Sequence, residues 1–210
     1  MDQDLQTKIF KWFAGRRIKI VDLFKYLYLA IAIFWVFAAY ENFSNGNLEG
    51  FIYKTGVGSG KIALLLLGIV VLPGILGRFR IEIKLTRIIT LFRRQLGIVA
   101  FLIAFTHFII VRGFLYISGF NPFKVPLELF VVMGMSALFL LFLMFLTSND
   151  TSKKRLGKWW KYLHRLIYLV LWLLVLHTGL QRISVWSVYI FIFASVEVAS
   201  WAYYFLKKRV

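Results

Sequence analysis

The stretch "LELFVVMGMSALFLLFLMFL" (127–146) decides the fold class of this chain. It contains a single ionisable residue, Glu128, near its beginning, and the other side chains are apolar or small. A helix needs about 20 mostly apolar residues to cross a membrane, because each residue adds about 1.5 Å along the helix axis. The stretch therefore predicts a membrane-spanning helix over residues 127–147.

Five further apolar runs of similar length surround this segment. Hydrophobic residues make up 60% of the 210 residues, compared with about 45–50% in a typical soluble domain. The first run is not followed by a small-x-small cleavage site, so we expect it to be retained rather than removed as a signal peptide. The sequence thus predicts a single all-α domain over 1–210, an integral membrane bundle of six transmembrane helices preceded by a basic arm at 1–20. The other five spans are expected at 21–40, 61–79, 96–117, 161–180 and 186–206.

The distribution of basic residues predicts the orientation of these spans. The formal net charge is +17, and the 26 Lys and Arg residues lie in clusters between the apolar runs, which is typical of a multi-spanning membrane protein rather than a nucleic-acid-binding protein. The positive-inside rule then places both termini in the cytoplasm. The aromatic and basic N-terminal arm either lies on the inner leaflet as an interfacial helix or is a solvated arm. With six spans, all but five of the basic residues fall on the side of the two termini; the five are Lys54, Lys61, Arg112, Lys124 and Arg182.

Three histidines are the candidate metal-binding residues. The chain has no cysteine, which excludes Cys-ligated iron–sulfur clusters and covalently attached c-type haem. Arg94 and Lys161 mark the cytoplasmic ends of the spans that contain His107 and His177. Counted from these cations at helical rise, His107 and His177 lie at depths of about 20 and 24 Å. His164 follows Lys161 closely and is expected near the inner interface.

The similar depth of His107 and His177 predicts that they hold one haem iron as axial ligands between neighbouring helices. His164 lies about 20 Å further in along the same helix, so it cannot share that iron. It would serve a second site or have another role. The alternative for any of the three histidines is a hydrogen bond that joins two helices within the membrane.

Two arginines accompany the predicted pair. Arg112 follows His107 by five residues, and Arg182 follows His177 by five residues. Both would lie outward of the imidazoles, where haem propionates would accept charge-assisted hydrogen bonds from them. The alternative is that both side chains extend to the outer membrane interface.

Two other polar features call for a structural interpretation. The segment "TGVGSGK" (55–61) lacks the first Gly and the final Ser or Thr of a phosphate-binding loop, so we expect a flexible loop that leads into the second helix. Glu197 is the single acidic residue of the last predicted helix. It would pair with a buried cation, relay a proton or make a structural hydrogen bond.

Three local patterns resemble the ferric-reductase-like transmembrane domain family. The most specific is "LTSNDTSKKRLGKWWKYLHRLIYLVLWLLVLH" (146–177), with R-L-G-K-x-W, L-H-x-x-x-Y and a second histidine at its end. The second is "TRIITLFRRQLGIVAFLIAFTHF" (86–108), and the weakest is "YKTGVGSGKIALLLLGIVVLPGILGRF" (53–79). Within the family the patterns are most similar to haem-binding membrane subunits of bacterial periplasmic methionine-sulfoxide reductase systems.

The resemblance implies a six-helix bundle in a bacterial inner membrane that carries b-type haem and moves electrons across the membrane. Larger members of the family use two histidines on helix three and two on helix five to bind two haems. Here Arg94 stands where the extra histidine of helix three would be, as far before His107 as His164 stands before His177. We therefore expect one haem, and the inner position with His164 and Arg94 is left for a second haem of different ligation or for FMN.

The resemblance also implies partners besides membrane lipid. The chain ends at Val210 without the flavin and nicotinamide domain of the larger members, so electrons are expected from a separate flavoprotein, a bound flavin or quinol. The outer acceptor would be a periplasmic molybdenum reductase, making the chain an electron-transfer subunit of an oxidoreductase system. The alternatives are a ferric or oxygen reductase-type subunit and, in a different class, a non-redox membrane scaffold or transporter.

Overall fold

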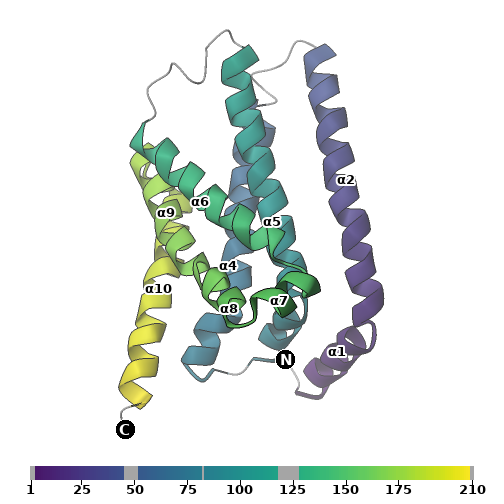
Figure 1. The fold of residues 1–210 in the computed structure, drawn as a ribbon, viewed down its shortest axis with the longest axis vertical. Coiled ribbons are helices and arrows are strands. Elements are labelled where there is room, and N and C mark those ends of the chain that lie inside the picture. Colours follow the sequence, from purple (N-terminus) through teal and green to yellow (C-terminus); the bar gives the residue numbers. More distant parts are fainter. Residues whose placement is uncertain (1–2, 45–51, 82, 118–127, 209–210) are drawn as a thin grey trace.

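The computed structural model describes residues 3–44, 52–81, 83–117 and 128–208 (Figure 1). Over these residues every regular element is a helix, which confirms the predicted all-α fold. In chain order the elements are α1 (Gln3–Gly15), α2 (Arg17–Ser44), the π-helix η1 (Ile52–Val57), α4 (Gly58–Arg78), α5 (Lys84–Ile117), α6 (Leu129–Leu146), α7 (Asp150–Leu156), α8 (Lys158–Arg165), α9 (Ile167–Gln181) and α10 (Val185–Lys208).

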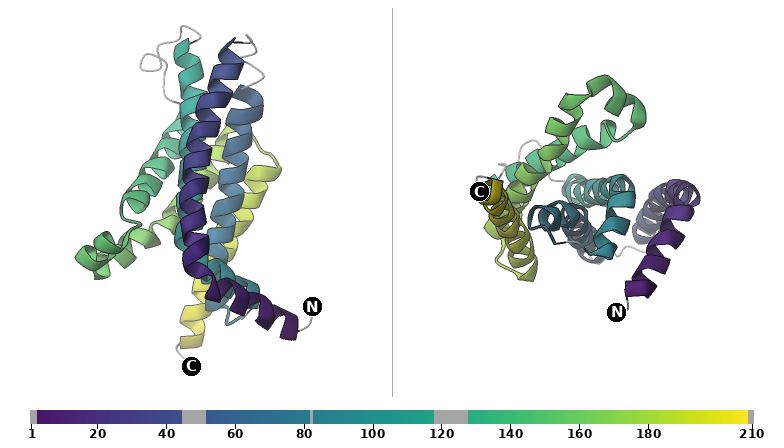
Figure 2. Two further views of the ribbon diagram at one scale, coloured as in Figure 1. Left: turned by 90° about the vertical axis from the view of Figure 1, so that its right-hand side faces the viewer. Right: turned by 90° about the horizontal axis from the view of Figure 1, so that it is seen from below.

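Among the described residues, five helical segments are long and apolar enough to cross a membrane, and they coincide with the second to sixth predicted spans. The first predicted span, 21–40, lies within the 28-residue helix α2 and stays a prediction, as does the cytoplasmic position of the termini. Helix α1 and the last turns of α10 lie toward the same end of the bundle (Figures 1 and 2). The five segments are Lys54–Arg78, Lys84–Arg112, Leu129–Leu146, Lys158–Gln181 and Val185–Lys207.

Helix α5 extends further toward this end of the bundle than the predicted span 96–117. It has 34 residues and begins at Lys84. Arg87, Arg93 and Arg94, which precede the predicted span, therefore lie on its first three turns. We call the end of the bundle where α5 begins and α10 ends the basic end.

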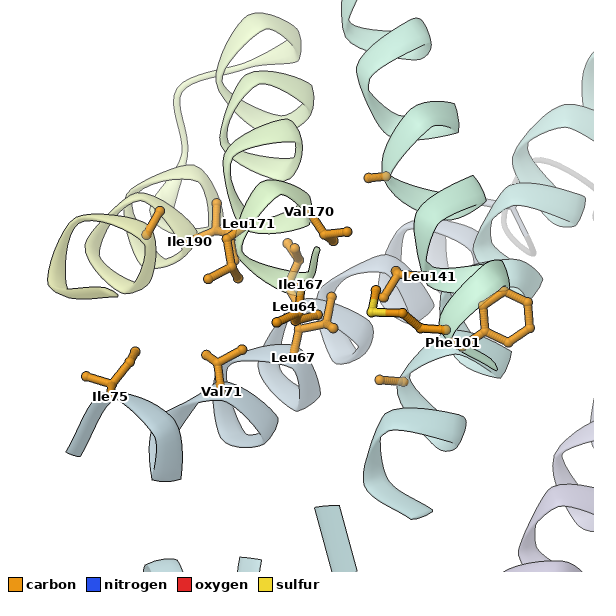
Figure 3. Packing of buried hydrophobic residues seen from close by; sticks show 14 residues of the cluster. Leu64, Leu67, Val71, Ile75, Phe101, Leu141, Ile167, Val170, Leu171 and Ile190 are labelled. Carbon is orange, nitrogen blue, oxygen red and sulfur yellow. The ribbon is translucent and has the colours of Figure 1, made fainter. Parts of the chain in front are cut away.

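The hydrophobic core forms around α4. Its buried residues Leu64, Leu67, Val71 and Ile75 recur every three or four positions, which places them along one side of the helix. They face buried side chains of α5, α6, α9 and α10, as Figure 3 shows for Phe101, Leu141, Ile167, Val170, Leu171 and Ile190. In this way the core holds α5 and α9, the helices that carry His107 and His177, in one bundle.

A buried ion pair joins α4 to α10 at the basic end. The Arg78 guanidinium lies 3.2 Å from the Glu197 carboxylate and donates to the Ser200 hydroxyl at 2.7 Å. It also donates to the Tyr168 hydroxyl of α9 at 2.8 Å and lies over the Trp201 ring at 4.7 Å. Glu197 thus pairs with a buried cation, one of the three roles that the sequence left open.

Candidate functional site

The structure brings His107 of α5 and His177 of α9 together. Their ring centroids are 6.5 Å apart, and the ring planes meet at 74°. Two metal–nitrogen bonds of about 2 Å, with about 1 Å from each ligating nitrogen to its ring centre, span about 6 Å. The separation of the two imidazoles therefore suits a single metal ion held between them.

A backbone carbonyl on another helical element, η1 or α6, orients each imidazole. Nδ1 of His107 lies 2.7 Å from the Gly56 carbonyl of η1, and Nδ1 of His177 lies 2.8 Å from the Phe130 carbonyl of α6. A carbonyl oxygen only accepts hydrogen bonds, so each Nδ1 must carry the proton and donate it. In a neutral imidazole this leaves the lone pair of Nε2 for a metal, and the carbonyl contact fixes the orientation of the ring.

A glycine lies beneath each imidazole. A Cβ placed on Gly60 of α4 would lie 3.0 Å from Nδ1 of His107, and a Cβ on Gly134 of α6 would lie 2.6 Å from Nδ1 of His177. A side chain at Gly134 would collide with the ring of His177, and one at Gly60 would require the ring of His107 to shift by a few tenths of an ångström. In both cases the accepting carbonyl, at Gly56 or at Phe130, lies four residues before the glycine. Both histidines thus occupy the same kind of seat, made of a glycine and the carbonyl one helical turn earlier.

The glycine-rich segment 55–61 forms one of these seats, so the prediction of a flexible loop was wrong. Its residues belong to η1 and to the first turn of α4. The Ser59 hydroxyl, which is buried, also donates to the Gly56 carbonyl at 2.8 Å. Gly60 allows the close approach of the His107 imidazole.

The two predicted propionate partners differ in their surroundings. Arg112 lies on α5, and its Nη2 is buried without a hydrogen-bond partner among the residues that the structure describes. A buried donor left without a partner costs about 1–3 kcal/mol, so this position favours a ligand that accepts a hydrogen bond. Arg182 directly follows α9 and is exposed.

His164 lies apart from the pair, on α8. Its Nε2 is 3.3 Å from the Thr147 hydroxyl, and the Trp160 ring stacks on the imidazole with centroids 4.0 Å apart. The Trp160 indole donates to the Thr147 carbonyl at 2.9 Å, which ties α8 to the end of α6. These contacts are those of a histidine that joins two helices, the alternative that the sequence left open. A role of His164 in a second cofactor site stays a prediction.

Arg94 is held by an acidic residue. Its guanidinium lies 2.8 Å from the Asp150 carboxylate at the start of α7. This hydrogen bond and the positive charge of Arg94 hold the pKa of the exposed Asp150 carboxyl below its usual value. The pair joins α5 to α7 at the basic end. The predicted contact of Arg94 with an inner cofactor stays a prediction.

Residues 59–175 match the family model described as "Ferric reductase like transmembrane component". The chain belongs to this ferric reductase-like transmembrane family. The matched region contains His107 and His164 and ends two residues before His177. Together with its apolar helices, the match identifies a multi-pass membrane protein.

Two proteins with similar sequences have more specific names. The chain is 40% identical over 100 residues to the protein-methionine-sulfoxide reductase heme-binding subunit MsrQ of Agrobacterium fabrum, over 45% of each chain. It is 39% identical over 88 residues to the protein of the same name from Herminiimonas arsenicoxydans, over 40% of each chain. The similar segments thus span less than half the length of these relatives. No solved structure matches the chain.

The sequence did not predict the two glycine–carbonyl seats of the histidine rings. Gly134 and Phe130 stand in an apolar run in which nothing distinguishes them, and Gly56 and Gly60 stand in a stretch typical of loops. The one available signal was a small residue within a membrane helix, which permits close contact with a neighbouring helix. That signal does not indicate which side chain occupies the space.

Proposed function

We propose that this protein is a haem-binding electron-transfer subunit of a bacterial inner membrane, with His107 and His177 as the axial ligands of one b-type haem. The observation that carries the proposal is the pair of imidazoles 6.5 Å apart, each with Nδ1 directed to a backbone carbonyl. Two imidazoles that donate from Nδ1 would each offer an Nε2 lone pair, a ligand set suited to haem iron.

The residues around the pair fit such a group. The seats at Gly60 and Gly134 hold both rings, and the carbonyl hydrogen bonds make the imidazoles better electron donors to a metal. Nη2 of Arg112, which is buried without a hydrogen-bond partner among the described residues, suits the carboxylate of a haem propionate. Because the sequence has no cysteine for thioether attachment, the haem would be held without covalent links to the protein. When bound, haem iron gains and loses one electron at a time, and the protein tunes its potential.

The direction of electron flow follows from the expected topology and from the names of the relatives. The positive-inside rule places the basic end in the cytoplasm, where a flavoprotein, a bound FMN or quinol would supply electrons. The pair formed by His107 and His177 would then lie toward the outer side. The acceptor we propose is a periplasmic methionine-sulfoxide reductase, because the relatives carry that name as its heme-binding subunits.

The first test is the visible absorbance of the purified protein. The unmodified protein is expected to show the bands of low-spin haem, and His107→Ala and His177→Ala are each expected to abolish them. His164→Ala is the matched control and should retain the spectrum, because that imidazole lies against Trp160 and Thr147. A colourless protein would exclude the electron-transfer role and favour a scaffold or transporter. Loss of haem in His164→Ala alone would show that the ligands are assigned wrongly.

A further inference from the structure

A basic groove lies at the basic end of the bundle, away from the histidine pair. It has a volume of about 390 Å³ and is lined by Phe10 of α1, Arg17 of α2, and Arg87, Thr90 and Leu91 of α5. The groove is shallow and open, and two of the five residues that line it carry guanidiniums.

Aromatic packing holds the walls of this groove in place. The Phe92 ring of α5 contacts the Phe13 ring of α1 edge-on, with centroids 6.1 Å apart, and stacks on the Phe24 ring of α2 at 6.2 Å. Lys84 at the start of α5 also donates to the Thr7 hydroxyl of α1. Three helices thus meet at defined positions, so the groove is built by tertiary contacts rather than by one helix face.

The groove lies at the first turns of α5. Helix α5 begins at Lys84 and has 34 residues, which at helical rise is about 51 Å, more than the roughly 40–45 Å of a bilayer with its headgroups. Arg87 lies in the first turn and Leu91 lies one turn further along the helix. We therefore expect this basic first part of α5 at the cytoplasmic headgroup layer.

The N-terminal helix supports an interfacial location. Figure 2 shows α1 turned away from the long axis of α2 at the end of the bundle. Trp12 of α1 is exposed, and the Arg16 guanidinium lies 4.5 Å from the centre of its ring. Helices that combine aromatic and cationic side chains in this way bind at the boundary between headgroups and acyl chains.

We propose that this groove binds the phosphate of an anionic phospholipid. Arg17 and Arg87 supply the positive charge, and Phe10 and Leu91 supply apolar contacts for the glycerol and the upper part of an acyl chain. The Thr90 hydroxyl donates to the Thr86 carbonyl at 2.7 Å. In this proposal the selection for charge comes from the positive charge of the two guanidiniums. Basic pockets between membrane helices near a membrane surface bind anionic headgroups for this reason.

Native mass spectrometry of the full chain in neutral detergent tests the proposal. Phosphatidylglycerol is titrated against phosphatidylcholine, and we expect at least roughly tenfold tighter binding of phosphatidylglycerol. The double variant Arg17→Gln/Arg87→Gln should lose most of this preference, again by roughly tenfold. The charge-preserving variant Arg17→Lys/Arg87→Lys should bind the anionic lipid more tightly than the Gln variant. Neither arginine contacts the histidine pair, so haem content serves as a check on folding.

The matched control is Lys154→Gln/Arg155→Gln on α7. It removes the same charge from exposed residues on another side of the bundle (Figure 2) and should leave phosphatidylglycerol binding within about threefold of the unmodified protein. Equal losses in the control and groove variants would overturn the proposal, as would equal binding of the two lipids. Competition by free glycerol phosphate at the affinity of the lipid would show a site for a soluble anion instead. If the double Gln variant does not fold, Arg17→Gln and Arg87→Gln alone must each weaken binding by roughly threefold or more.

Discussion

At the scale of single residues, neighbouring glycines and backbone carbonyls determine where the two histidine rings lie. Gly60 and Gly134 leave the space in which the imidazoles lie, and the carbonyls of Gly56 and Phe130 fix the protonated nitrogen. Such partners outside the ligand shell typically change metal affinity by about 10–100-fold when they are lost. The proposed haem site would therefore depend on glycines as well as on histidines.

Gly134→Ala should weaken haem binding. The new Cβ would lie 2.6 Å from Nδ1 of His177, so the ring must move and its hydrogen bond to the Phe130 carbonyl lengthens or breaks. We expect roughly 10–100-fold lower haem affinity, measured by titration of haem into the apoprotein. Gly97→Ala on α5 is the matched control, since nothing lies within 4 Å of its added Cβ. An unchanged affinity in Gly134→Ala would contradict the proposed role of the seat.

At the scale of helices, the buried and the exposed ion pair are expected to contribute differently to stability. Arg78 and Glu197 join α4 and α10 with side chains that are 11% and 4% exposed. Arg94 and Asp150 join α5 and α7, and the Asp150 side chain is 77% exposed. Removal of one partner from a buried pair leaves an uncompensated charge, whereas an exposed charge is solvated by water. The two pairs therefore predict different responses to substitution.

Glu197→Gln should destabilise the protein strongly. It leaves the Arg78 guanidinium buried without its carboxylate, which typically costs about 3–5 kcal/mol. In a chain of this length that corresponds to a melting temperature lower by roughly 10 °C, measured by circular dichroism in detergent. Asp150→Asn, the comparison at the exposed pair, should change the melting temperature little. Similar shifts in both variants would mean that burial does not control the response.

The pH dependence of the exposed pair has a defined sign. The folded-state pKa of Asp150 is held below its usual value by Arg94. The contribution of this ion pair is therefore fully present at neutral pH and is lost as the pH falls through the lowered pKa. Contact between α5 and α7 should accordingly be insensitive to pH changes within the physiological range.

At the scale of the whole molecule, orientation in the membrane determines which side the histidine pair faces. The natural sequence has no cysteine, so a single introduced cysteine can be labelled without background. Arg182→Cys should react with a membrane-impermeant maleimide in intact spheroplasts. Arg155→Cys on α7 should react only after lysis, because the basic end faces the cytoplasm under the positive-inside rule. The reverse pattern would place the basic end outside and invert the proposed direction of electron flow.

The sequence was sufficient for the coarse architecture, because crossing a membrane is a property of local composition. The run at 127–146 predicted α6 closely, and four other spans were found in the same way. Residue counts also predicted that His107 and His177 lie at a similar level, since rise per residue is constant in a helix. The structure accordingly places the two rings side by side.

Local composition and residue counts could not predict how segments distant in the sequence pack against each other. That Gly56 accepts from His107, 51 positions away, depends on which helices are neighbours and how they are rotated. Contacts between elements likewise produce the break at Leu166, which separates α8 from α9. They also bring α1, α2 and α5 together around Phe92. Apolar patterning indicates that a helix lies in the membrane because lipid solvates any apolar face. It does not indicate which face meets a neighbour, and that choice is made by side-chain packing and hydrogen bonding in the folded bundle.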